Sequence, residues 1–289
     1  MSKTFEELQA ENEQLKIQLQ EEKEKLSSAI EQLEESKKEL TDSISYAERI
    51  QGAIMPPISY VKSVLPKSFI LYLPKDVVSG DFYFVEQIGD EVVFAAVDCT
   101  GHGVPGALMS VVGFNYLHQA VTEKHITKPS EILSFLDAGV NERLRQTDGA
   151  SGVNDGMDLG LCTLNTKTKV LQYAGAYNPL YVISKGEIIE IKADKFPIGV
   201  NTDGTVDEYT NHTIQLQEGD CIYLFSDGYA DQFGGDKGKK FKYSKLRQTL
   251  LEMNHLTMPE QKIKMIEIFE NWKGNQEQID DVLLMGVRI

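Results

Sequence analysis

The chain has 289 residues, of which 41% are hydrophobic and 25% are charged, and its formal net charge is −15. This size allows one well-buried domain of over 200 residues and an accessory segment. The acidic excess argues against a nucleic acid or an anionic membrane as partner, because both bind basic surfaces.

Cysteine usage and the N-terminal sequence indicate a cytoplasmic protein. The three cysteines, Cys99, Cys162 and Cys221, form no CxxC pair, and two of them lie inside apolar runs where a thiol is usually a small core residue. The first residues contain no apolar signal segment. No stretch approaches the ~18–20 apolar residues that a transmembrane helix needs. We therefore expect a reduced, cytoplasmic chain without a membrane span.

Residues 1–54 are predicted to form a coiled-coil helix. They contain no proline, their first glycine is Gly52, and apolar residues recur at the 3.5-residue spacing of a coiled coil. Asn12 on this seam is the kind of polar residue that fixes register in a two-stranded assembly. The second seam turns polar or small between Leu15 and Ile50, so pairing should be weak there. We predict a homodimer through this helix; a single solvated helix is the alternative. One seam carries Phe5, Asn12, Leu19, Leu26, Leu33, Leu40, Ala47 and Ile54.

Residues 55–289 are predicted to form one domain of antiparallel strands and paired helices. Pro56 and Pro57 end the first helix, and short apolar runs separated by turn residues follow. Two helix pairs inserted among many strands suggest sheets that are covered by helices on the outside. Strands are predicted at 69–73, 82–87, 91–97, 157–164, 170–176, 180–184, 187–191, 213–217, 221–225 and 282–287, and helices at 104–121, 130–146, 243–253 and 259–272.

Four aspartates in glycine-rich or acidic segments are the candidate site. Asp98 and Asp227 follow apolar runs, Asp280 precedes one, and Asp81 follows Gly80. An aspartate at a strand end, next to a permissive glycine, can point its carboxylate at a shared position. Oxygen ligands of this kind suit hard divalent cations such as Mg²⁺ or Mn²⁺. A two-metal centre with one activated water requires no Cys or His side chain as ligand.

At these residues the chain resembles the SpoIIE-like serine phosphatases, a bacterial branch of the metal-dependent (PPM, type 2C) protein phosphatases. Each segment alone is a weak signal, because Asp-Gly is a common turn. Four segments in the same order and with matching spacing make a strong one. The resemblance covers about residues 45–289. The four segments are Gly80-Asp81-Phe82-Tyr83, Asp98-Cys99-Thr100-Gly101-His102-Gly103, Phe225-Ser226-Asp227-Gly228 and Asp280-Asp281. The stretch Tyr46-Ala47-Glu48-Arg49-Ile50-Gln51 also resembles the family's entry helix.

The resemblance implies an α+β fold, a four-layer αββα sandwich with two Mn²⁺ or Mg²⁺ ions between the sheets. Asp81 would bridge the ions, Asp98 and the carbonyl group of Cys99 would bind one ion, and Asp227 and Asp280 would bind the other. Water activated by the ions would attack the phosphorus of phosphoserine or phosphothreonine directly. These aspartates are accordingly the expected catalytic residues.

The roles of four residues near these segments stay open. Lys75 stands where relatives often have an arginine and is a candidate for contacting phosphate. His102 either donates a proton to the leaving oxygen or is an exposed turn residue. Asp158 begins an apolar strand and is either near the metals or merely exposed. Only one of Asp280 and Asp281 should point inward on a strand, and the family register favours Asp280.

Two further segments are assigned from the residues alone. Ser226 is expected to bond within a turn and not to act as a nucleophile, because it lacks the glycine pattern of a nucleophile elbow. Residues 234–240, rich in glycine and lysine, lack the spacing of a nucleotide-binding loop. We expect a loop there that helps to contact an acidic phosphoprotein.

The resemblance also implies the substrate, a phosphorylated regulatory protein such as a STAS-type anti-sigma-factor antagonist in partner-switching signalling. We expect the N-terminal coil and the helix at 46–51 to couple to the metal-binding loops, so that alanine at Ile50 or Ile54 alters activity. Two alternatives remain: a pseudophosphatase that binds without turnover, and a coiled-coil adaptor whose carboxylates hold a structural Ca²⁺.

Overall fold

The computed structural model describes residues 4–144, 155–199 and 208–289, and these form two compact units, Met1–Ala47 and Glu48–Ile289. The first unit contains most of α1 (Phe5–Ile54). Most of its large apolar side chains, among them Leu15, Leu26 and Leu33, are more than half exposed. The coiled coil and the boundary expected after residue 54 stay predictions. Among the described residues, none of the helices combines the length and apolar character of a bilayer-spanning segment.

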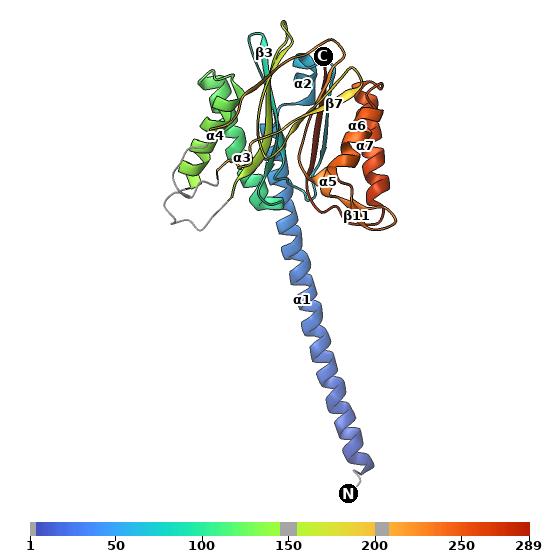
Figure 1. The fold of residues 1–289 in the computed structure, drawn as a ribbon. Helices are drawn as coiled ribbons and strands as arrows, with labels where there is room; N and C mark the ends of the chain where they lie inside the picture. The colour runs from blue at the N-terminus through green and yellow to red at the C-terminus, as the bar shows by residue number, and fades with distance from the viewer. Residues whose placement is uncertain (1–3, 145–154, 200–207) are drawn as a thin grey trace. The chain divides into compact units, whose positions relative to one another are not determined.

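The second unit contains two five-stranded antiparallel sheets packed face to face (Figure 1). One sheet has the order β2-β3-β4-β5-β8, with β2 (Phe82–Ile88), β3 (Glu91–Cys99), β4 (Met157–Asn165), β5 (Val170–Ala176) and β8 (His212–Gln215). The other has the order β1-β12-β9-β6-β7, with β1 (Ser68–Leu73), β12 (Val282–Arg288), β9 (Cys221–Phe225), β6 (Leu180–Ser184) and β7 (Glu187–Ile191).

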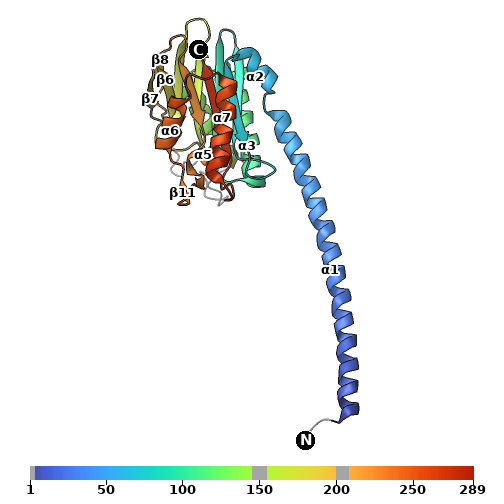
Figure 2. The same ribbon diagram turned by 90° about the vertical axis from the view of Figure 1, so that its right-hand side faces the viewer.

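Helices cover the outer face of each sheet (Figures 1 and 2). On the β2–β8 sheet lie α3 (Gly103–His118), its π-helical continuation η1 (Gln119–Glu123) and α4 (Pro129–Leu144). On the β1–β7 sheet lie α6 (Tyr243–Glu252) and α7 (Met258–Lys273), the latter opened by a capping box between Thr257 and Glu260. The expected four-layer αββα architecture is confirmed.

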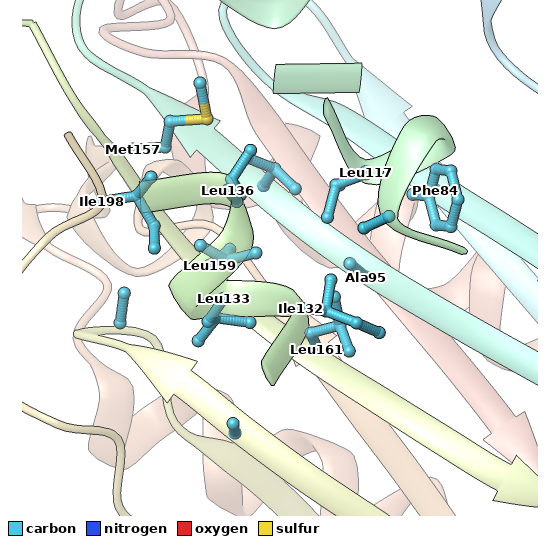
Figure 3. Close-up of a cluster of buried hydrophobic side chains, with 14 of the residues drawn as sticks. Phe84, Ala95, Leu117, Ile132, Leu133, Leu136, Met157, Leu159, Leu161 and Ile198 are labelled. Carbon is cyan, nitrogen blue, oxygen red and sulfur yellow. The ribbon is translucent and has the colours of Figure 1, made fainter. Parts of the chain in front are cut away.

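The central strands are apolar throughout because both of their faces are covered. Along β3, Val93, Ala95 and Val97 belong to the core under α3 and α4, which Figure 3 shows. The alternate residues Val92, Phe94 and Ala96 belong to the core between the sheets. Successive side chains of a strand point to opposite faces, so one run of six apolar residues supplies two cores.

The structure adds short elements that the sequence pattern did not predict. Helix α2 (Ile58–Val64) begins directly after Pro57, which serves as its N-cap residue. Helix α5 (Gly228–Asp231) follows Asp227. The stretch 234–240, expected as a loop, forms a hairpin of β10 (Phe233–Gly234) and β11 (Lys239–Lys240). The expected helix at 130–146 matches α4, and its last two residues lie outside the described residues.

Candidate metal centre

Asp81 lies in the connection between β1 and β2, at one end of the sandwich. Its side chain is 2% exposed, and its backbone N–H donates to the Ser79 hydroxyl at 3.0 Å. Its Oδ2 is buried and accepts no hydrogen bond from any described residue. A buried carboxylate oxygen without a partner is costly, so this atom marks a position where a positive group is missing.

Asp98 and Asp158 face each other across two neighbouring strands. They are directly opposite in the antiparallel register of β3 and β4. The strands continue in contact beyond them, because the Thr100 N–H donates to the Gly156 carbonyl and the Gly156 N–H donates to the Thr100 hydroxyl, both at 2.9 Å. Like charges opposite each other destabilise a sheet. Asp158, whose role the sequence left open, therefore belongs to the acidic cluster.

Asp227 and Asp280 come from the other sheet. Asp227 lies two residues after β9 and directly precedes α5, and Asp280 lies two residues before β12. The hydroxyl of Ser226 accepts the backbone N–H of Leu283 at 2.9 Å, which holds the end of β9 against β12. Ser226 therefore bonds across two strands, and not within a turn as the sequence suggested.

Asp281 has a different task from Asp280. Its two carboxylate oxygens accept the backbone N–H groups of Lys75, at 2.7 Å, and Gly80, at 2.8 Å. It is 2% exposed and therefore ties the start of β12 to the loop that carries Asp81. Asp280 instead accepts the N–H of Asp281 at 2.9 Å and remains partly exposed. Both residues precede β12, and Asp281, rather than the Asp280 favoured by the sequence, is the more deeply buried of the two.

Burial and mutual repulsion raise the pKa of every carboxyl in this cluster. The pKa values of Asp81 and Asp98 are raised well above the ordinary range, first by burial and then by repulsion from Asp98 and Asp227 respectively. Burial and the Asp227 charge raise the pKa of Asp158 to about 6. The pKa of Asp227 is also raised to about 6, by burial and by Asp280. These groups are close enough to resist ionising together.

Glycines bring two of the acidic loops into backbone contact. A Cβ atom at Gly80 or at Gly106 would clash with the carbonyl oxygen of Gly101, which itself has a φ of +81°. A Cβ at Gly80 would also lie 3.1 Å from the carbonyl oxygen of Cys99. The backbone carbonyl group expected to bind one ion therefore lies against the loop of Asp81. The Cys99 side chain is buried, and burial raises the pKa of its thiol.

A cationic group lies at the edge of the cluster. The Lys75 ammonium lies 2.9 Å from Nε2 of His102, and Nδ1 of His102 lies 2.6 Å from a carboxylate oxygen of Asp76. Because the ammonium can only donate, His102 accepts at Nε2 and donates from Nδ1. Lys75 and His102 both lower the pKa of Asp280, which burial nevertheless leaves raised. These two residues are therefore partly exposed polar groups beside the carboxylates.

The donor set suits hard cations. It consists of carboxylates and a backbone carbonyl, with one buried oxygen unpartnered and an excess of negative charge, which are the properties of Mg²⁺ or Mn²⁺ sites. Within residues 4–144, 155–199 and 208–289, no three His, Cys, Asp or Glu side chains are already arranged around a single ion position. Rearrangement of these side chains, together with water ligands, would be required to complete the coordination.

The sequence reasoning expected the helix at 46–51 to couple to the metal-binding loops but did not single out Gln51 as the residue that makes the contact. Its amide N–H₂ donates to the Ser79 carbonyl at 2.6 Å and to the Ser110 hydroxyl at 2.8 Å, and its Oε1 accepts the Ser79 N–H at 3.1 Å. It therefore joins the end of α1 to α3 and to the residue before Gly80. The sequence signal was a glutamine at the end of a charged helix, which is not distinguishable from a solvated residue.

Comparisons with known proteins agree with this geometry. A family model described as Stage II sporulation protein E (SpoIIE) matches residues 88–289. A search of curated proteins finds no match. Among solved structures, the chain is similar to the SiaA-PP2C domain of Pseudomonas aeruginosa, with 32% identity, a TM-score of 0.79, and coverage of 88% of this chain and 98% of that one.

Two more distant structures share the fold. One is the PP2C phosphatase domain with a fragment of the regulatory domain of SpoIIE from Bacillus subtilis, at 20% identity and a TM-score of 0.60, covering 77% of this chain and 63% of that one. The other is RsbX in complex with magnesium, at 14% identity and a TM-score of 0.53, covering 77% and 94%. The family match and the similarity to the SiaA domain show that the chain belongs to the SpoIIE family of PP2C-type serine phosphatases.

Proposed function

We propose that this chain hydrolyses phosphoserine or phosphothreonine on a regulatory protein and uses two Mn²⁺ or Mg²⁺ ions. The observation that carries the proposal is the crowding of Asp81, Asp98, Asp158, Asp227 and Asp280, all with raised pKa values and with one buried oxygen of Asp81 unpartnered. Carboxylates that repel each other in the folded chain need a positive partner to ionise together. The magnesium complex of RsbX, a structural neighbour, supports a divalent ion as that partner.

In this proposal each aspartate has a defined task. Asp81, in the loop that joins the two sheets, would contribute to both ions. Asp98 and the Cys99 carbonyl would hold one ion, and Asp227 and Asp280 would hold the other. When bound, the ions supply a water of lowered pKa and screen the charge of the phosphate group. The protein holds the two sheets, and therefore the ligands, in a fixed relation.

Residues beside the cluster select a phosphate monoester. The Lys75 ammonium lies at the edge of the carboxylates. One of its N–H groups donates a hydrogen bond to His102, which leaves two N–H groups for phosphate oxygens. Asp76 fixes the ring of His102 by accepting its Nδ1 proton. The SpoIIE family membership supports a STAS-type antagonist in partner switching as the substrate.

The N-terminal helix supplies regulation in this proposal. The apolar seam of residues 5–40 is more than half exposed at Leu19, Leu26 and Leu40, which favours a second copy of the same helix as its partner. The bonds of Gln51 to Ser79 and Ser110 join the last turn of α1 to the loop before Asp81. Movement of this turn would displace a proposed metal ligand.

The experiment is phosphate release from a phosphoserine STAS protein, and from para-nitrophenyl phosphate, with Mn²⁺, with Mg²⁺ and with EDTA. We expect release of phosphate only with a divalent ion. A chain that binds the phosphoprotein but releases no phosphate with either ion would be a pseudophosphatase. Turnover that survives EDTA would contradict the metal requirement.

A further inference from the structure

A strongly basic hairpin follows α5 in this acidic chain. We use the name basic hairpin for residues 233–245, which comprise β10, β11 and the start of α6. This segment contains five lysines and one aspartate, although the whole chain has a net charge of −15. All five lysines are exposed. They are Lys237, Lys239, Lys240, Lys242 and Lys245. A local positive surface on a negative protein attracts negative partners to one place and repels them elsewhere.

The hairpin is held firmly to the domain. The N–H of Gly235, which has a φ of +64°, donates to the Trp272 carbonyl at 2.8 Å, and a Cβ at this glycine would collide with the Trp272 ring. The Phe241 N–H donates to the Gln232 carbonyl at 2.9 Å. The Lys245 ammonium lies 3.7 Å from the centre of a Trp272 ring, in cation–π contact. The lysines are therefore presented on an ordered surface.

The hairpin lies next to the candidate metal centre. Asp227 precedes α5, and the Asp231 N–H donates to the Asp227 carbonyl at 2.9 Å, one helical turn away. Lys240 on β11 forms an ion pair with Asp231 at 2.6 Å. Figures 1 and 2 both show β11 at the end of the sandwich where α5 lies. A substrate bound at the carboxylates would extend across this hairpin.

Three of the lysines remain available to a partner. Lys240 is neutralised by Asp231, and Lys245 is stacked on Trp272. Lys237, Lys239 and Lys242 form no ion pair with any residue in the described part of the chain. Asp236 on the hairpin and Glu277 nearby are exposed acidic residues, so the positive charges outnumber the negative ones.

We propose that this hairpin binds acidic residues of the phosphoprotein that flank its phosphorylated serine or threonine. The inference rests on the proposed phosphatase function and adds the chemistry of the docking segment. One helical turn plus the span of a lysine–aspartate pair places the lysines about 10–20 Å from the site, which an extended peptide covers in about three to six residues. The recognised segment therefore carries Asp or Glu at that separation from the phosphorylated residue.

The test compares three phosphoserine peptides of equal length. One carries acidic residues three to six positions before the phosphoserine, one carries them after it, and one has glutamine or asparagine in their place. We measure kcat/KM with Mn²⁺ for the wild-type chain and for Lys237→Glu/Lys239→Glu, with para-nitrophenyl phosphate as a substrate too small to reach the hairpin. Fluorescence anisotropy of the same labelled peptides in EDTA measures binding without turnover.

We expect the wild-type chain to prefer one acidic peptide over the neutral one, and the double variant to lose about tenfold in kcat/KM for it, since each exposed charge pair contributes a fraction of a kcal/mol and each reversed charge adds repulsion. Turnover of para-nitrophenyl phosphate should stay within about twofold, because the hairpin does not contact the reacting atoms. The preference should also decrease with added salt, because exposed charges are screened.

The matched control is Lys124→Glu/Lys185→Glu, which changes net charge equally at exposed lysines outside the hairpin. The docking role is overturned if this control loses as much as the hairpin variant, or if the wild-type chain shows no acidic preference while it hydrolyses para-nitrophenyl phosphate. If no substrate is hydrolysed with either metal, the phosphatase proposal fails. In that case anisotropy decides separately whether the hairpin binds acidic peptides.

Discussion

The two ends of the β-sandwich differ in how their carboxylates are balanced by nearby positive charges. At one end, Asp98, Asp158 and Asp227 lie close together, and all three pKa values rise, with only partial compensation at Asp227 by Lys240. At the other end of the sandwich, Glu218 pairs with Lys67 at 2.8 Å and Lys169 at 2.6 Å, and these lysines lower its pKa to about 2. Among the described residues, lysines therefore balance the carboxylate at the second end but do not balance the carboxylates at the first.

A surface cavity of the domain lies at the Glu218 end, and not at the end with the unbalanced carboxylates. It has a volume of about 240 Å³ and is lined by Leu65, Leu164, Val287 and both lysines of the Glu218 cluster. This cavity lies away from all of the proposed ligands. We place the function at the carboxylate end because the chemistry there requires an external cation, whereas the cavity shows no polar group without a partner among the described residues that line it.

The largest expected effect is on metal-dependent turnover, when one aspartate of the carboxylate end is replaced by asparagine. Asp98→Asn or Asp227→Asn should reduce metal-dependent turnover about a thousandfold, because a two-metal site supplies several kcal/mol of transition-state stabilisation. The same changes should raise the melting temperature of the metal-free protein, since each removes a repelled charge. Glu218→Gln is the control at the other end and should leave turnover unchanged. Full activity of Asp98→Asn and Asp227→Asn would remove the proposed site.

A smaller effect is expected when the support of the carboxylate end is weakened. Gln51→Ala leaves the carbonyl and N–H of Ser79 without their side-chain partners, which costs about 1–3 kcal/mol for buried groups. We expect a lower melting temperature and a higher Mn²⁺ concentration for half-maximal activity. Gln248→Ala removes an exposed bond to Glu252 on α6 and should change neither quantity. If Gln51→Ala and Gln248→Ala behave alike in both measurements, the end of α1 does not support the loop that carries Asp81.

The smallest expected effect is the pH dependence of the stability of the metal-free protein. Asp158 and Asp227 have folded pKa values of about 6, above the value of an unfolded carboxyl, so the folded state binds more protons between pH 4 and 6. Stability is therefore highest at low pH in this window and is lost as pH rises through 6. After allowance for solvent screening, about 1 kcal/mol, or about 2–4 °C in melting temperature, is expected.

The measurement is thermal unfolding in EDTA from pH 5 to 7.5, for the wild-type chain and for Asp158→Asn/Asp227→Asn. The double variant should show a flatter pH dependence. Glu218→Gln should not flatten it, because the pKa of Glu218 is lowered and its contribution is lost only as pH falls below the ordinary range. Identical slopes in all three proteins would contradict the repulsion between the aspartates.

Much of the fold was predictable because local pattern and burial agree. The run from Val92 to Val97 predicts a strand covered on both faces, and β3 is such a strand. Helix α2 was missed because Pro56 and Pro57 end one helix, and the same Pro57 then begins another. Proline is also favourable at the start of an α-helix, so the same proline can mark the end of one helix or the beginning of the next.

The candidate site was predictable where a motif marks it and not where only tertiary contacts do. Asp98 is the penultimate residue of β3 and Asp227 lies two residues after β9, so their position at the strand ends could be read from the sequence. Asp158 looked like an exposed first residue of a strand, and only the register with β3 places it opposite Asp98. Gln51 and Asp281 act through backbone groups of the loop before Asp81, which no sequence pattern identifies.

The acidic cluster belongs to neither sheet alone. Asp81 lies in the loop that joins β1 of one sheet to β2 of the other, Asp98 and Asp158 lie on the β2–β8 sheet, and Asp227 and Asp280 flank strands of the β1–β7 sheet. The full set of carboxylates is therefore assembled only when the two sheets pack against each other. A nascent chain that has not yet added its final strand lacks the complete set of proposed metal ligands.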